Sequence, residues 1–202
     1  MPKGVTRRRP QTRARLLESA LAAFAELGFH ATSIEEICDR AGYTRGAFYS
    51  NFASKDELFF ALFDENAEKV LERFERAATE IDPSATWQQQ IATVLAAAGP
   101  GDRNWYLTSM EFSLHAIRDP RAAAILAEHD AKLRAALTGI VAGIFDRFGL
   151  ALTIDPDLFA RLVVAIREGG RAQSYVEPDR LGLGELERLF LPMVLEAVST
   201  TD

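Results

Sequence analysis

A helix-capping pattern followed by a tight turn constrains this chain more than any other feature. Ser33-Ile34-Glu35-Glu36 has the spacing of a capping box, in which the serine side chain accepts a bond from the backbone three residues further on. Gly42 then ends the helix, because glycine adopts the left-handed backbone at little cost. Thr44 is placed to cap another helix, which we expect to run from Arg45 to about Phe52. The pattern predicts two short helices joined by a tight turn.

A third helix completes a compact N-terminal bundle. Its apolar residues recur at helical spacing from about Thr12, and Gly28 ends it. Phe48 and Phe52, four residues apart, would pin the last short helix to the other two. That arrangement turns a cation, two small residues and several hydrogen-bonding tips outward: Arg45, Gly46, Ala47, Tyr49, Ser50 and Asn51. These residue types suit the major groove of DNA, so the bundle is expected to be a helix-turn-helix.

A basic arm without acids, Lys3 to Arg15, precedes the bundle. Residues 1–55 hold nine Lys/Arg and five Asp/Glu, which gives a charge of +4. Since the whole chain has a net charge of −6, the rest of the chain carries −10. This asymmetry orients the N-terminal end toward a polyanion. Residues 1–11 are expected to be mobile. Arg7, Arg8, Arg9 and Arg13 would either enter a narrow minor groove or contact phosphates diffusely, and we favour diffuse contact with ordering on DNA.

Several functional classes lack their sequence patterns. The single cysteine, Cys38, permits no intramolecular disulfide, and no apolar run is long enough to span a membrane, so a cytoplasmic protein is expected. None of the histidines has zinc-site spacing, and neither a dinucleotide fingerprint nor a nucleophile elbow is present. We therefore expect neither an enzyme nor a metal site, and no cofactor.

The remaining chain, 64–202, shows helical periodicity with no credible strand. Proline- and glycine-containing breaks divide it into several helices, including a long one over about 121–148 and a last one over about 185–199. The predicted fold is all-α: a basic arm (1–11), a three-helix DNA-binding domain (12–63) and a C-terminal helical domain (64–202).

Two segments, ALAAFAELGFHATSIEEICDRAG (20–42) and YTRGAFYSNFASKDELFFALF (43–63), closely resemble the DNA-binding domain of the TetR family of bacterial regulators. The resemblance implies a homodimer that binds a palindromic operator and leaves it when a small molecule enters the C-terminal domain. It also implies phosphate contacts by Thr32 and Ser33, base reading by Thr44, Arg45, Gly46 and Ala47, and backbone clamps at Tyr49 and Lys55.

The chain departs from the family pattern at three positions in this region. Ala47 stands where threonine is frequent, Asn51 where histidine is frequent, and Tyr43 where valine is frequent. Tyr43 would either pack on the turn or offer its hydroxyl to a phosphate. These departures leave the base sequence of the operator open.

The last two helices are more apolar than one buried face requires, which favours a four-helix interface between two subunits. The predicted interface residues are Val163, Ile166, Leu186, Leu189, Phe190, Met193, Val194 and Ala197. The middle helices carry aromatic residues and isolated polar ones that would either line an effector cavity or belong to the core: Trp87, Trp105, Met110, Glu111, His115, Phe145, Arg167 and Gln173.

These observations predict a homodimeric repressor that a small, mostly hydrophobic effector releases from a palindromic operator. Two alternatives stay open. The first is an architectural DNA binder without an effector. The second is a helical small-molecule carrier whose DNA module has lost its function.

Overall fold

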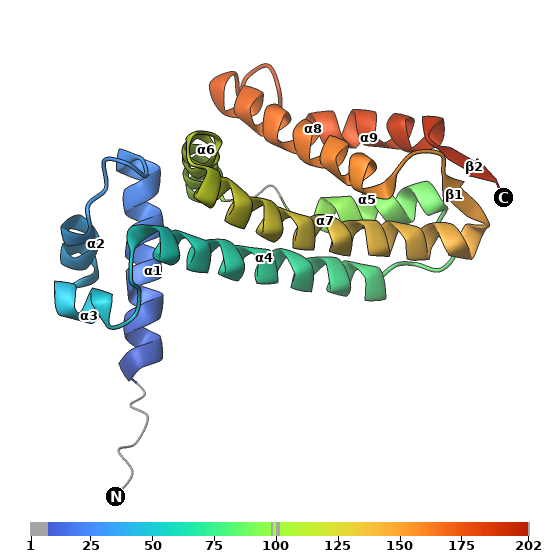
Figure 1. Ribbon diagram of the computed structural model, residues 1–202. Coiled ribbons are helices and arrows are strands. Elements are labelled where there is room, and N and C mark those ends of the chain that lie inside the picture. The colour runs from blue at the N-terminus through green and yellow to red at the C-terminus, as the bar shows by residue number, and fades with distance from the viewer. Residues whose placement is uncertain (1–7, 98, 100–101, 202) are drawn as a thin grey trace, which may run out of the picture. The chain divides into compact units, whose positions relative to one another are not determined.

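A computed structural model describes residues 8–97, 99 and 102–201, and these residues are almost entirely helical (Figure 1). In chain order the elements are α1 (Arg8–Leu27), α2 (Ile34–Ala41), α3 (Arg45–Tyr49), α4 (Lys55–Thr79), α5 (Trp87–Ala97), α6 (Arg103–Arg118), α7 (Pro120–Phe148), β1 (Leu150–Leu152), α8 (Pro156–Val176), α9 (Glu185–Ala197) and β2 (Ser199–Thr201). Within the described part of the chain, every helix is too short or too polar to cross a membrane. The all-α class is confirmed.

The described residues form two compact units. Residues 8–67 and 102–129 make the first, and residues 68–97, 99 and 130–201 make the second. The chain passes between the units within α4, between α5 and α6, and within α7. The sequence pattern placed α6 in the C-terminal domain, whereas α6 packs against α1 in the first unit. The predicted boundary at 63/64 therefore does not coincide with this division.

Aromatic rings make up much of the core of the first unit. Phe59 of α4 and Phe112 of α6 stack with their ring centroids 3.6 Å apart. Phe29, which follows α1, meets Phe112 edge to face at 5.2 Å. All three side chains are fully buried, as is Phe48 of α3. Because packed rings leave little room for adjustment, they fix the positions of the short helices within this unit.

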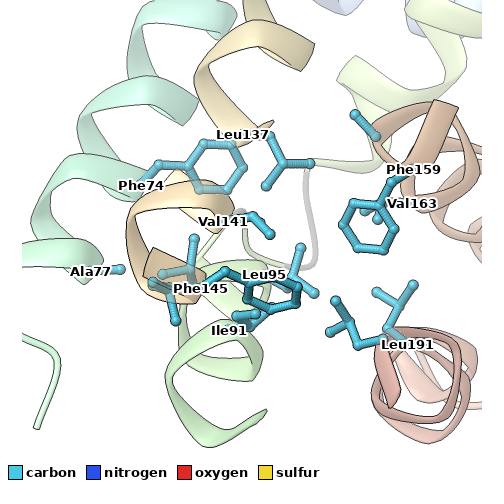
Figure 2. Packing of buried hydrophobic residues seen from close by; sticks show 14 residues of the cluster. Phe74, Ala77, Ile91, Leu95, Leu137, Val141, Phe145, Phe159, Val163 and Leu191 are labelled. Carbon is cyan, nitrogen blue, oxygen red and sulfur yellow. The ribbon is translucent and has the colours of Figure 1, made fainter. Parts of the chain in front are cut away.

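The core of the second unit draws on α4, α5, α7, α8 and α9 (Figure 2). Phe74, Ile91, Val141, Phe159 and Leu191 are one contribution from each of these helices. Phe145 of α7 meets Trp87 of α5 edge to face at 5.3 Å. This packing is the reason for the apolar periodicity of the C-terminal sequence.

Two helix boundaries differ from prediction. α1 begins at Arg8 and not near Thr12, so the last residues of the expected arm are helical. Pro10 does not prevent this, because a proline in the first turn has no helical hydrogen bond to lose. α3 ends at Tyr49, earlier than Phe52. The side chains of Ser50 and Asn51 bond to the carbonyl of Ala47 at 2.8 Å each, which competes with continuation of the helix.

The expectation that the C-terminal region holds no strand is wrong. β1 follows α7, β2 follows α9, and the two pair antiparallel with Ala151 opposite Thr200 (Figure 1). Three-residue strands carry too little periodicity to be recognised in a sequence. The pairing ties the end of α9 to the α7–α8 connection in the second unit.

Candidate DNA-binding surface

The α2–turn–α3 geometry follows from three local features. The Ser33 side chain accepts a bond from the N–H of Glu36 at 3.0 Å and caps α2. Gly42 ends α2 with φ 72°, in the left-handed region. The Thr44 side chain accepts from the N–H of Ala47 at 3.2 Å and caps α3. Both predicted caps and the glycine stop are confirmed, and together they set the angle between the helices.

The burial of α3 separates an inner from an outer face as predicted. Phe48 is fully buried, and Phe52 beyond the helix end is 3% exposed. Arg45, Gly46, Tyr49 and Ser50 are exposed, while Ala47 is half-buried. Among the described residues, only the Thr44 hydroxyl lies within 4 Å of a Cβ added at Gly46, at 3.7 Å, so this surface is open to another molecule. A helix with a cationic, small-residue outer face suits the major groove.

Arg45 is held from two sides at the start of α3. Its Nη1 lies 2.5 Å from a carboxylate oxygen of Glu35 on α2, and its Nη2 donates to the Tyr49 hydroxyl at 3.5 Å. Its guanidinium carbon also lies 5.9 Å from the centroid of the Tyr49 ring. The bond to Tyr49 and the charge of Glu35 raise the pKa of the Arg45 guanidinium. Arg45 is therefore presented as a cation in a defined position.

The arginines of the arm belong partly to α1. Arg7 lies outside the described residues, and Arg8 is the first helical residue. Arg9 donates to the carbonyl of Ser50 at 3.1 Å, next to the end of α3. Arg13 pairs with Glu65 at 3.2 Å and lies 5.5 Å from the centroid of the Phe52 ring. Arg9 thus places a cation beside α3, whereas Arg13 is engaged by α4.

Thr32 and Lys55 have structural bonds that sequence reasoning missed. The Thr32 hydroxyl is buried and donates to the carbonyl of Gly28 at 2.8 Å, so its proton is already used within the fold. The Lys55 ammonium donates to the carbonyls of Phe29 at 2.5 Å and Thr32 at 2.9 Å, with His30 further away. These carbonyls use the donors that we assigned to a phosphate.

Two other predicted contacts lie near the turn. Ser33 is exposed, although its hydroxyl oxygen already accepts the capping bond. Tyr43 is half-buried, and its backbone N–H donates to the carbonyl of Cys38 at 2.9 Å. The two roles predicted for the Tyr43 side chain therefore stay predictions.

The candidate effector residues divide between the two units. Trp105, Met110, Glu111 and His115 belong to α6 in the first unit, where Trp105 meets the Phe63 ring at 5.6 Å. His115 lies against Phe29 and His30, and its buried Nε2 has no hydrogen-bond partner among the described residues. The carboxylate of Glu111 approaches Gly28, so that an added Cβ would lie 3.5 Å from it. These contacts make part of the α6 set a packing surface for the helix-turn-helix.

Most of the candidate effector residues in the second unit also pack or form hydrogen bonds within the fold. Trp87 and Phe145 pack on each other. Arg167 donates to the carbonyls of Leu95 at 3.1 Å and Gly99 at 2.9 Å, at the end of α5. Burial lowers the pKa of Arg167 to about 10. Gln173 is exposed on α8 and lines a groove of about 260 Å³ together with predicted interface residues.

The predicted interface residues fall into two groups. Leu189, Phe190 and Met193 are 50%, 49% and 62% exposed, and Ala197 is exposed too. Ile166, Leu186 and Val194 are half-buried. Val163 is 1% exposed within its own subunit, so its assignment to the interface is wrong. One face of a helix packs inward, and periodicity alone did not separate the two sides of α8.

Known proteins match this chain in both its N-terminal and its C-terminal part. Residues 16–62 match "Bacterial regulatory proteins, tetR family", and residues 83–196 match "BetI-type transcriptional repressor, C-terminal". The transcriptional repressor Rv1474c of Mycobacterium tuberculosis is 29% identical over 140 residues, 68% of each chain. Other curated relatives match over 31–42% of this chain and 28–41% of their own length.

Solved structures share the fold over nearly the whole chain. GusR of Salmonella enterica superposes with a TM-score of 0.74, 24% identity and 96% coverage of both chains. FadR of Bacillus subtilis in complex with stearoyl-CoA superposes with a TM-score of 0.72, 19% identity and coverage of 90% of this chain and 96% of that one. The matched family and the curated relatives are transcriptional regulators and not enzymes. The chain belongs to the TetR family of bacterial transcriptional regulators.

Proposed function

We propose that this chain is a homodimeric repressor that binds a palindromic operator and is released by a small, mostly hydrophobic effector. The exposed outer face of α3, with Arg45 and Tyr49 at its centre, is the observation that carries the proposal. Repression is favoured over activation because the C-terminal match and the relative from M. tuberculosis are both named repressors. Such a regulator would work in the cytoplasm, where bacterial DNA lies.

The apolar surface of α8 and α9 supports the dimer. Leu158, Leu162, Leu189, Phe190 and Met193 are all at least 38% exposed on these two helices. An exposed apolar face of this extent marks an interaction surface. Next to it, the groove bounded by Gly169 and Phe190 leaves room for a partner's side chain. A second copy of the same face would cover these residues by two-fold symmetry.

Two-fold symmetry also fits the proposed operator. A dimer presents two copies of α3, and the half-sites they read lie about one helical turn, ~34–36 Å, apart on DNA. Each α3 contributes only a few base-reading side chains, so a single copy has limited specificity. Two copies on one palindrome make the second binding event intramolecular, which raises the affinity.

The proposed effector acts through differential affinity. A ligand changes DNA binding only if it binds one of two conformations better, and coupling of about 1–3 kcal/mol is typical. The FadR neighbour was solved with stearoyl-CoA, whose acyl chain is hydrophobic, and this supports an effector with a hydrophobic part here. α4 offers a route for coupling, since it starts beside the helix-turn-helix and continues into the second unit.

Selection of genomic DNA fragments by the purified protein at physiological salt tests the proposal. Enrichment of one palindrome, bound by a dimer, is the expected result. Release of that palindrome by a compound, found by screening metabolites of the neighbouring genes, would establish the effector. Sequence-blind, salt-sensitive retention would favour the architectural alternative. Ligand binding without any DNA retention would favour the carrier.

A further inference from the structure

We propose that Glu35 is a specificity-determining residue, which restrains Arg45 and so weakens binding to DNA of arbitrary sequence more than binding to the operator. The inference rests on the proposed operator recognition. Glu35 was not among the residues that the sequence pattern assigned to DNA binding. Its role becomes visible only because the turn between α2 and α3 brings it next to Arg45.

The restraint is geometric. Glu35 is the second residue of α2 and Arg45 the first residue of α3, and an ion pair of 2.5 Å joins them. The Tyr49 hydroxyl accepts a second bond from the same guanidinium. Arginine has five N–H donors, so these two bonds leave three available. The guanidinium is thus oriented by neighbours on two helices while one edge remains able to bind.

The restraint affects phosphates and bases differently. Non-specific binding depends on cations that replace the counterions of DNA, and an arginine already paired with a carboxylate is a poorer replacement. The Glu35 carboxylate, 53% exposed, also repels nearby phosphates. A guanine offers two acceptors in a plane, which an oriented guanidinium edge can meet while it keeps its carboxylate partner. Restraint therefore favours base contact over phosphate contact.

Glu36 provides a matched comparison within the same turn of α2. Its carboxylate accepts from the Nε of Arg40 at 2.6 Å, and Arg40 also pairs with Glu26 at 2.7 Å. Glu36 carries the same charge as Glu35 one residue away, but its partner Arg40 lies in α2 itself. Replacing either acid by glutamine changes the net charge equally. Only Glu35→Gln releases Arg45.

The test measures Kd of the full-length protein for the selected operator and for a scrambled duplex of equal composition, across a salt series. Glu35→Gln should raise affinity for the scrambled duplex by roughly two- to 25-fold in a dimer, since an exposed pair is worth a factor of about 1.4 to 5 per subunit. Affinity for the operator should change less than about twofold. The specificity ratio should therefore fall, and the scrambled duplex should show a steeper salt dependence.

Two controls decide whether the restraint is the cause. Glu36→Gln should leave the ratio near the wild-type value, and in an Arg45→Ala background Glu35→Gln should change it no more than Glu36→Gln does. Equal ratios for wild type and Glu35→Gln, or an equal fall in both glutamine variants, would overturn the assignment while leaving operator recognition intact. A wild-type protein that prefers no sequence at all would overturn the proposed function, and this inference with it.

Discussion

The two units of this protein differ in how their functional residues relate to the sequence. In the first unit, the outward residues of α3 lie within about one helical turn of the Thr44 cap, which itself follows the glycine that ends α2. Their placement therefore follows from local rules. In the second unit, Arg167 on α8 caps the end of α5, more than sixty residues earlier in the chain. No local pattern contains that pairing.

An isolated polar residue in an apolar helix therefore has at least two physical explanations. One is a ligand contact, and the other is a bond to backbone groups that burial would otherwise leave unsatisfied. Arg167 has the second kind of partner, and so does Lys55 in the first unit. Local sequence patterns therefore predict the placement of α3 residues well. They fail in both units for residues such as Lys55 and Arg167, which bond to backbone groups far away in the sequence.

The largest expected effect comes from the exposed face of the second unit. Phe190→Asp combined with Met193→Asp would bring charges into the proposed interface, where burying them unpaired costs several kcal/mol. We expect a monomer by light scattering, with operator affinity lowered by about 100-fold or more because the two half-sites are no longer bound together.

Ile117→Asp is the matched control for this face, since Ile117 is 81% exposed on α6 of the first unit. It should leave the dimer intact. A dimer that survives both aspartates on α9 would show that exposure of this face has another cause.

Arg167→Met should lower stability by about 2–3 kcal/mol, because the partly buried carbonyls of Leu95 and Gly99 both lose the donor from Arg167. For a chain of this size that corresponds to a fall in Tm of roughly 5–10 °C. Gln173→Ala, at an exposed position on the same helix, should shift Tm by about 1–2 °C at most. An unchanged Tm for Arg167→Met together with a missing effector response would restore the ligand role that the sequence suggested.

Arg45→Ala should weaken operator binding by about 1–3 kcal/mol and relax specificity at one base position, as expected for a base-reading arginine. Tyr49→Phe, which removes only the hydroxyl that accepts from Arg45, should have a smaller effect in the same direction. Fluorescence anisotropy measures both, while sedimentation should show the dimer unchanged. Full affinity in both variants would remove α3 from the recognition surface.

How much the sequence could reveal depends on the range of the interactions. The caps at Ser33 and Thr44 and the inward Phe48 followed from spacing alone. Val163 did not, because an apolar residue on α8 fits a subunit core and a dimer face equally well. The strands did not, because three residues show no period. The partner of Arg45 is ten residues away across the turn, so only the folded geometry identifies Glu35.

The smallest expected effect comes from deletion of the N-terminal arm. This deletion tests how much the charge of the arm contributes to DNA binding, apart from the geometry of α3. Deleting residues 1–9 removes four cations per subunit, Lys3, Arg7, Arg8 and Arg9. We expect a several-fold fall in operator affinity and a shallower slope of log K against log salt, by roughly 0.9 for each phosphate that the arm no longer neutralises. Arg9→Gln alone tests the one cation of the arm that the described residues place beside α3. If that single variant reproduces the whole change in slope, Arg9 accounts for the contribution of the arm. If the deletion leaves the slope unchanged, α3 and its neighbours make all the salt-sensitive contacts.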